Sequence, residues 1–474
     1  MSLTYFSGDF LQDTALLDSV LRVKESFDMV GRDIMIGSLR AKLYFVDGFC
    51  KDELMERIMA FLMKLKDEKT SPKMTARDFS NAFVPYVETD VVGDVDGVVK
   101  AVLSGAVAMV VDKRRDVVII DARTYPVRAV DEPENDKVLR GPHDGFVETI
   151  VFNTALIRRR VRDPNLIMHI CSVGKKSKTD VVLCYIDDRV DKEILATVKK
   201  KIEKIDINSL AMGQQSLIEC LVRKQWYNPF PKVRYTERPD AAAASALEGS
   251  IVILTDNSPA AMIIPSGIFD FLQDTNDYYM SPFVGSYIRI IRSLVFAITL
   301  LLTPVWLLLM QNPELIPPQL EFIKVEQETT VPFVIQLLII ELIIDALKMA
   351  SLNTPNALGN SFSVVGALVL GEFAVSSGWF VSEVVLYMAF VAITNFVQPS
   401  FELGYAFKIM RIILIILIAL FNLWGFAAGI ALTVFLIATT KTVSGKSYLY
   451  PLIPFKPQAL LSLILRRPIS IKNS

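Results

Sequence analysis

The stretch Ser293–Met310, SLVFAITLLLTPVWLLLM, decides the class of fold, because none of its side chains is charged. A helix of about 20 apolar residues is long enough to cross the ~30 Å hydrocarbon core of a bilayer. Further apolar runs lie at Phe333–Leu347, Phe362–Ser376, Phe380–Val397, Ile409–Leu423 and Gly425–Ala438. The pattern predicts a polytopic α-helical membrane domain of six spans, or of four or five spans if some of the shorter runs are re-entrant.

Basic residues around these runs predict their orientation. With the N-terminus inside, the inner flanks hold Arg289, Arg292, Lys348, Lys408, Arg411, Lys441 and Lys446, and the outer loops hold Lys324 among several glutamates. Cytoplasmic loops carry an excess of Lys and Arg. Met1–Asp13 has no basic segment followed by an apolar run, so no secretory signal is expected. We therefore predict that both termini are cytoplasmic.

The second apolar run carries charge at membrane depth. Glu341, Asp345 and Lys348 are spaced i, i+4 and i+7, which places them on one face of a helix as an intramembrane polar stripe. Two interpretations are open. The stripe is either docked on its own protein or at the interface, with Asp345 paired to Lys348, or it faces a water-filled path or another subunit.

The third apolar run contains the candidate pore-lining residues Val364, Val365, Gly366, Val369 and Glu372. In a symmetric oligomer Glu372 would form a ring of carboxylates, and such rings favour cations. The three valines would then supply a narrow apolar constriction. The alternatives are a lone acid on the outer surface and ordinary helix packing.

The first 280 residues have ordinary mixed polarity and are predicted to form an α/β cytoplasmic N-terminal domain of two subdomains. We expect residues 1–130 and 131–245 to be these subdomains, 246–287 a β-hairpin with a juxtamembrane aromatic segment, 288–441 the transmembrane helical domain, and 442–474 a cytoplasmic C-terminal tail. Strands are predicted at Ser38–Gly48, Val107–Val111, Val117–Ile120, Asn165–Cys171, Asp180–Ile186, Ile251–Thr255 and Ala260–Ile264. Helices are predicted at Asp52–Lys66, Asn153–Val161 and Lys192–Lys204.

Soluble chemistry finds little support in the sequence. Nucleotide-binding, zinc-protease and serine-hydrolase motifs are missing, and the two histidines and four scattered cysteines suggest neither a catalytic nor a metal site. We predict no enzymatic activity and no cofactor. The net charge of −1 gives no reason to expect nucleic acid as a partner. The basic run Arg158–Arg160 with Arg162 is expected on a solvated or subunit-contacting face, with anionic-lipid or ligand binding as the alternative.

Several ordered segments together resemble a known family. They are Asn153–Arg160 (NTALIRRR), Thr236–Asp240 (TERPD), Glu248-Gly249 with the following hairpin, Tyr278–Arg289, and Val364–Gly371 (VVGALVLG). From Phe27 to Pro457 the chain resembles the A subunits of GerA-type spore germination receptors. One departure is Glu372, where the family more often has Gln, and this leaves the ion preference open.

The resemblance implies a multi-pass protein of the spore inner membrane that forms a ring oligomer, a pentamer, around a path for monovalent cations such as potassium. It also implies partners: receptor subunits or, in the branch that the opening segment resembles, a small membrane protein. It places the pore at Val364–Gly371. A secondary transporter and a non-conducting membrane scaffold are the alternative functions.

Overall fold

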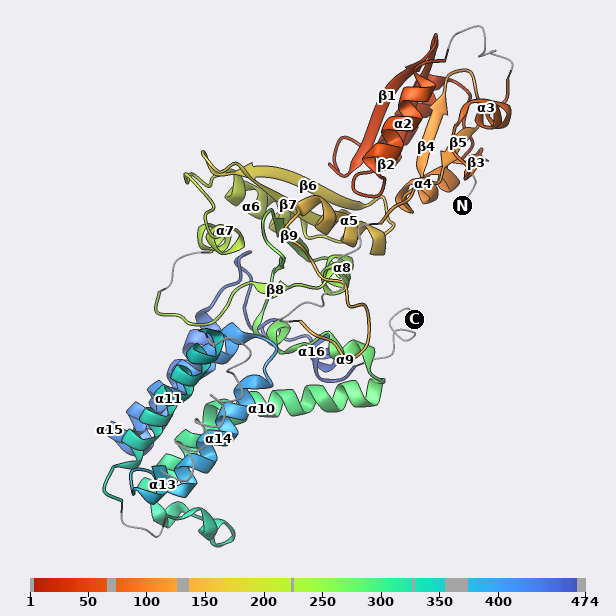
Figure 1. The fold of residues 1–474 in the computed structure, drawn as a ribbon. Coiled ribbons are helices and arrows are strands. Elements are labelled where there is room, and N and C mark those ends of the chain that lie inside the picture. The colour runs from red at the N-terminus through yellow and green to blue at the C-terminus, as the bar shows by residue number, and fades with distance from the viewer. Residues whose placement is uncertain are drawn as a thin grey trace. The chain divides into compact units, whose positions relative to one another are not determined.

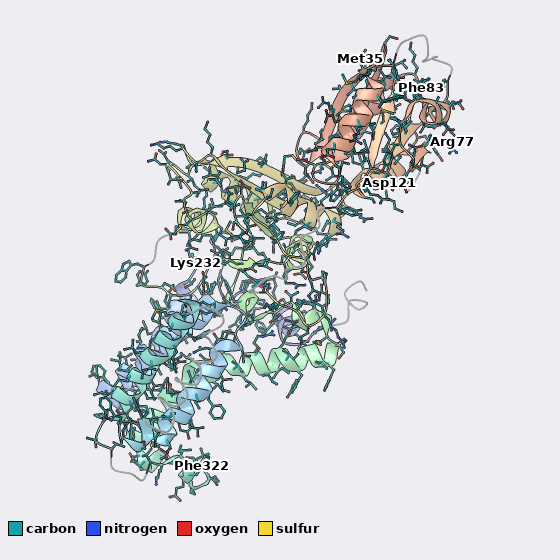
Figure 2. All side chains as sticks on the ribbon, viewed as in Figure 1. Met35, Arg77, Phe83, Asp121, Lys232 and Phe322 are labelled. Carbon is teal, nitrogen blue, oxygen red and sulfur yellow. The ribbon has the colours of Figure 1, made fainter. Side chains whose placement is uncertain are left out.

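The computed structural model describes residues 4–65, 74–125, 136–222, 226–325, 329–353 and 374–466. The chain forms two compact units (Figure 1). The α/β unit comprises Met1–Lys224 and Val233–Pro265, and the helical unit comprises Gln225–Lys232 and Ser266–Ser474. Figure 2 adds the side chains in the same view.

The first sheet of the α/β unit is antiparallel throughout, with the order β1-β2-β4-β5-β3. Its strands are β1 (Met29–Ile36), β2 (Leu39–Val46), β3 (Thr89–Val92), β4 (Val107–Val111) and β5 (Val117–Ile120). Successive side chains of a strand point to opposite faces, so each face has its own core. Tyr44 and Val46 pack on the side of α1 (Phe10–Val20) and α4 (Val95–Leu103). Ala41 and Leu43 pack on the side of α2 (Asp52–Leu62) and α3 (Ala76–Phe83).

The second sheet is also antiparallel, with the order β6-β7-β9-β10-β8. Its strands are β6 (Leu166–Val173), β7 (Thr179–Ile186), β8 (Arg234–Thr236), β9 (Ile251–Thr255) and β10 (Ala261–Ile264). The helices of this part are α5 (Ile150–Arg160), α6 (Lys192–Glu203), α7 (Gln214–Leu221) and α8 (Pro239–Leu247), of which α5 and α8 share a core with the sheet. We expected the β9–β10 hairpin in a separate segment, 246–287. The structure instead places β9 beside β7, with Leu254 opposite Val182, because both strands are apolar enough to be buried.

Arg158 at the end of α5 contradicts the solvated face expected for the basic run. Its Nε lies 2.7 Å from Oδ2 of Asp28, which directly precedes β1, and both side chains are 1% exposed. Its Nη2 also donates to the carbonyl of Leu166. The partner is 130 residues away in the sequence, so charge spacing alone did not reveal it. Arg160 binds Asp144, with Nη2 2.6 Å from the carboxylate.

The helical unit contains α9 (Asn276–Tyr279), α10 (Pro282–Gln311), α11 (Phe333–Asn353), α13 (Ala374–Ser376), α14 (Ser382–Phe396), α15 (Phe401–Thr439) and α16 (Pro457–Ile464), with short 3₁₀ turns at Ile268–Leu272, Pro313–Leu315 and Pro318–Ile323. Among the described residues, α10 and α15 are the two helices that are long and apolar enough to cross a membrane. The helices α11 and α14 cover two more of the expected spans. The third expected span lies mostly outside the described residues.

The helix α15 is two arms joined at Asn422, whose φ of 52° breaks the helix. A Cβ placed on Gly425 would lie 1.9 Å from the carbonyl oxygen of Leu417. Residues eight apart in a straight helix are about 12 Å apart, so the chain has turned back on itself. Asn422 also exchanges side-chain hydrogen bonds with Asn312 at the end of α10. The reversal falls where the fifth and sixth expected spans adjoin.

Candidate functional site

Glu341 of α11 lies at the centre of a buried charge cluster. Arg411 of α15 approaches it with Nε 2.7 Å and Nη2 2.5 Å from Oε1, and Lys408 lies with Nζ 3.1 Å from Oε2. The Glu341 and Lys408 side chains are each 4% exposed, and that of Arg411 is 0% exposed. Lys408 and Arg411 are three residues apart, so both point from one face of α15 toward α11.

The other two members of the polar stripe also face α15. Asp345, four residues after Glu341, forms an ion pair with Lys408. Lys348 lies with Nζ 5.7 Å from the ring centre of Tyr405, a cation–π distance. The structure thus places the stripe Glu341, Asp345 and Lys348 against a neighbouring helix of the same chain.

Polar groups from two more helices complete the cluster. Arg411 Nη1 donates to the backbone carbonyl of Thr299 in α10 at 2.6 Å. The Thr299 hydroxyl lies 2.9 Å from the hydroxyl of Thr394 in α14 and accepts from Gln398 Nε2 at 3.1 Å. Four helices are therefore linked through buried polar contacts, which is the usual way for charge to be held inside a helical bundle.

A small cavity adjoins the cluster, lined by Lys348, Asn395, Phe401, Gly404, Tyr405 and Lys408, with a volume of about 10 Å³. That is roughly the space of one water molecule. Of its lining residues, Asn395 has a buried oxygen, Oδ1, with no hydrogen-bond partner among the described residues. A water placed there would find the polar neighbours that it needs.

The electrostatics of the cluster favour a structural role. Two carboxylates, Glu341 and Asp345, face two cations, Lys408 and Arg411, so the inner charges balance. A buried ion pair repays the cost of removing both charges from water only when its geometry and remaining hydrogen bonds are good. The short ion pairs of Glu341 and Asp345 with Lys408 and Arg411 hold α11 against α15.

Lys408 and Arg411 are expected from the sequence on an inner flank, and the structure buries both of them as partners of Glu341, a pairing that the sequence did not predict. The sequence did contain a signal for this pairing. Lys408 and Arg411 are three residues apart and Glu341 and Asp345 are four apart, so each pair lies on one helix face and the two faces can meet. The pore candidates Val364, Val365, Gly366, Val369 and Glu372 lie outside the described residues.

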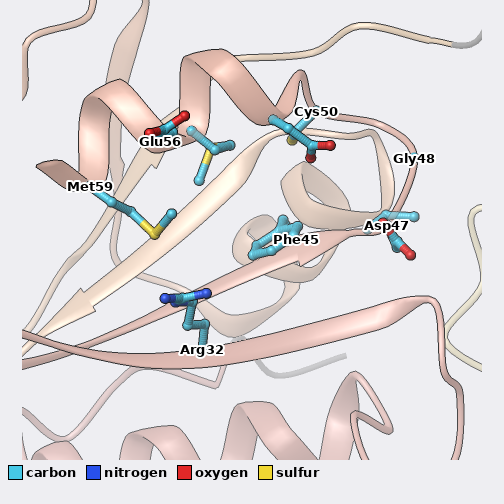
Figure 3. A pocket seen from close by; sticks show the side chains of 10 residues that line it. Arg32, Phe45, Asp47, Gly48, Cys50, Glu56 and Met59 are labelled. Carbon is cyan, nitrogen blue, oxygen red and sulfur yellow. The ribbon is translucent and has the colours of Figure 1, made fainter.

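The α/β unit has a separate cavity of about 210 Å³ between the first sheet and α2, where Arg32 faces a rim that includes Asp47 and Glu56 (Figure 3). Burial raises the pKa of Asp47 and raises that of the Cys50 thiol to about 12. Within the described ranges no group of three or more His, Cys, Asp or Glu residues is placed to hold a metal ion.

The long apolar helices α10 and α15, together with the two antiparallel sheets, define the class of protein. They fit a membrane protein that carries an α/β part. Residues 18–474 match the family model described as Bacillus/Clostridium GerA spore germination protein. The chain belongs to this family, as the ordered segments in the sequence predicted, and membership supports a role in spore germination.

Curated relatives agree with this assignment. Stage V sporulation protein AF of Bacillus subtilis (strain 168) is 37% identical over 441 residues, which cover 93% of this chain and 89% of the relative. Spore germination protein KA of the same organism is 29% identical, covering 94% of this chain and 82% of the relative. The branch favoured by the opening segment is that of the first of these relatives, and this prediction is confirmed.

A solved structure is also similar. The crystal structure of the N-terminal domain of the A subunit of the Bacillus megaterium spore germinant receptor GerK3 is 24% identical, with a TM-score of 0.44. The match covers 56% of this chain and 98% of that one.

Proposed function

We propose that the chain is a subunit of a homo-oligomeric, pentameric cation channel in the spore inner membrane, which releases monovalent cations such as potassium during germination. The supporting observation is the buried cluster of Glu341, Lys408 and Arg411. Residues 354–373, which contain the candidate pore, directly follow α11. The ion pairs of the cluster hold α11 against α15, so the helix that leads into the candidate pore segment is held in place.

The charge balance of the cluster indicates that Glu341 and Asp345 have a different role from Glu372. Because Glu341 and Asp345 are matched by Lys408 and Arg411, they leave no net negative charge to attract a cation. The proposed selectivity therefore rests on a ring of Glu372 residues, one from each subunit, and the constriction on Val364, Val365 and Val369.

The proposal includes partners and excludes catalysis. We expect the channel to work with a small membrane protein or with other germination receptor subunits, with both chain termini in the cytoplasm.

A secondary transporter would require a substrate site of broken helices near the midplane. The break at Asn422 instead serves a chain reversal held by Asn312, which favours the channel over the transporter.

The decisive experiment is a reversal-potential measurement. The purified full chain is placed in a planar bilayer under a potassium chloride gradient, alone and with candidate partners. Unitary currents that reverse near the cation equilibrium potential, with weaker selectivity in Glu372→Gln, are the expected result. Saturable flux of one substrate without unitary currents would favour a transporter, and silence in every combination would favour a scaffold.

A further inference from the structure

Asp277 of α9 is a buried acid at the start of the first long apolar helix. It is 0% exposed, and its Oδ2 lies 3.2 Å from Arg289 Nε and 2.7 Å from Arg292 Nη1. Both arginines belong to α10, one turn apart. A single carboxylate therefore accepts from two guanidinium groups in a site from which water is largely excluded.

A third arginine of this site lies near the C-terminal end of the chain. Arg466, just beyond α16, donates through Nη2 to the carbonyl of Tyr278 at 2.6 Å, and its backbone N–H donates to the Ser286 hydroxyl at 3.0 Å. Arg289 Nη1 in turn donates to the carbonyl of Ser462 at 3.0 Å and stacks its guanidinium 4.9 Å from the Tyr278 ring centre. Figure 1 shows α9 and α16 beside α10.

The arginine cluster, which we define as Arg289, Arg292 and Arg466, has more positive charge than its acids neutralise. Its acidic partners are Asp277 and, at 3.5 Å from Arg292, Asp274. Arg289 is only 5% exposed, yet among the described residues its Nη2 atom has no hydrogen-bond partner, and neither has the buried Nη1 atom of Arg466. Buried donors without an acceptor are costly, and those of a guanidinium fit phosphate oxygens well.

Apolar side chains on the same helix indicate where such a phosphate would come from. Phe283, Tyr287 and Leu294 of α10 are 83%, 59% and 57% exposed. They share one exposed face of α10, opposite to Arg289 and Arg292 but at the same level of the helix, near the start of a helix long enough to cross a membrane. Exposed aromatic residues beside basic residues are typical of the level of lipid headgroups.

We propose that the arginine cluster binds the phosphate of an anionic glycerophospholipid at the level of the lipid headgroups. The phosphate oxygens accept from Arg289 Nη2 and Arg466 Nη1. The bound lipid thereby joins Arg466, just beyond α16, to α10. This binding site goes beyond the channel proposal and does not depend on it.

The test uses the full chain in detergent with short-chain phosphatidylglycerol as the probe, and follows the unfolding temperature during the titration. The comparison probes are short-chain phosphatidylcholine, which has the same phosphate but no net charge, and inorganic phosphate. The variants are Arg466→Gln and Arg289→Gln. Lys324→Gln, which removes a charge from a half-exposed position elsewhere in the helical unit, is the matched control.

We expect phosphatidylglycerol to stabilise the wild type and the control, and Arg466→Gln to weaken its binding about tenfold, the value of one charge-assisted hydrogen bond. Because Arg466 is partly exposed, this variant should fold even if Arg289→Gln does not. Unchanged lipid stabilisation in Arg466→Gln would overturn the proposal. Equal stabilisation by phosphatidylcholine or inorganic phosphate would overturn the assignment to an anionic lipid, as would no stabilisation at all.

Discussion

Arg411 Nη2 lies 2.5 Å from Glu341 Oε1, between two helices that are separated by 47 residues of sequence from Asn353 to Phe401. The Arg411 side chain is 0% exposed, so its charge depends on Glu341 and Thr299 for stabilisation. This pair links the helix that precedes the candidate pore segment to the helix that follows α14. Its loss should therefore affect both stability and conduction.

The first prediction concerns this pair. Arg411→Gln should lower the free energy of unfolding by about 3–5 kcal/mol, because Glu341 keeps a buried charge with one partner fewer. Thermal unfolding of the purified full chain measures the effect. The double variant Glu341→Gln with Arg411→Gln removes both charges and should recover part of the loss. Losses that simply add in the double variant would show that the two residues do not interact.

A second prediction concerns the corresponding pair in the α/β unit. Arg158→Gln should destabilise this unit by about 3 kcal/mol, since Asp28 is 1% exposed and would keep its charge without its main partner. Denaturant unfolding of the full chain checks this. Arg57→Gln, on the exposed side of α2, is the control and should change stability by less than about 0.5 kcal/mol. An equal effect of both changes would refute the role of the pair.

A third prediction concerns the chain reversal in α15. Gly425→Ala should prevent the close approach of the two arms, because the added Cβ would lie 1.9 Å from the Leu417 carbonyl oxygen. Gly429→Ala should be milder, since its nearest neighbour is the Leu414 side chain at 3.0 Å. The yield of folded protein and its unfolding temperature rank the variants. The opposite order would contradict the reversal at Asn422.

A fourth prediction uses the thiols. Burial raises the pKa of Cys50 to about 12 and that of Cys171 to about 11, whereas Cys220 is exposed. The thiolate is the reactive form, so at pH 8 Cys50 is almost entirely in the unreactive thiol form. Iodoacetamide should therefore label Cys220 first, as read by mass spectrometry. Labelling of Cys50 at the same rate as Cys220 would show that its thiol is not shielded from the reagent as the structure has it.

The fifth prediction tests the pore candidates. Val364→Ala, Val365→Ala or Val369→Ala should make the proposed channel leak, because a smaller side chain widens an apolar constriction that closes by dewetting. Conductance in planar bilayers and premature ion loss from spores are the measurements. Val434→Ala, at a position of α15 that is 58% exposed, is the matched control. Normal behaviour of all three variants would remove the pore assignment from this segment.

Local patterns in the sequence predicted much of the α/β unit. The strands Val107–Val111 and Val117–Ile120 have the expected bounds, because short β-branched runs around a charged turn specify a hairpin without distant help. The position of the β9–β10 hairpin was not predictable in this way. Its strands pair with β7 and β8, and pairing partners far apart in the sequence are not encoded in local periodicity.

The sequence by itself determined the apolar helices, the alternating strands, the family and the presence of charged residues within apolar runs, because each depends on residue type and short-range spacing. Only the tertiary structure decided where that charge goes. Glu341 meets Lys408 and Arg411, and Arg158 meets Asp28, across long separations. A buried charge must find an opposite charge to repay the cost of leaving water, and the fold alone determines which one lies within reach.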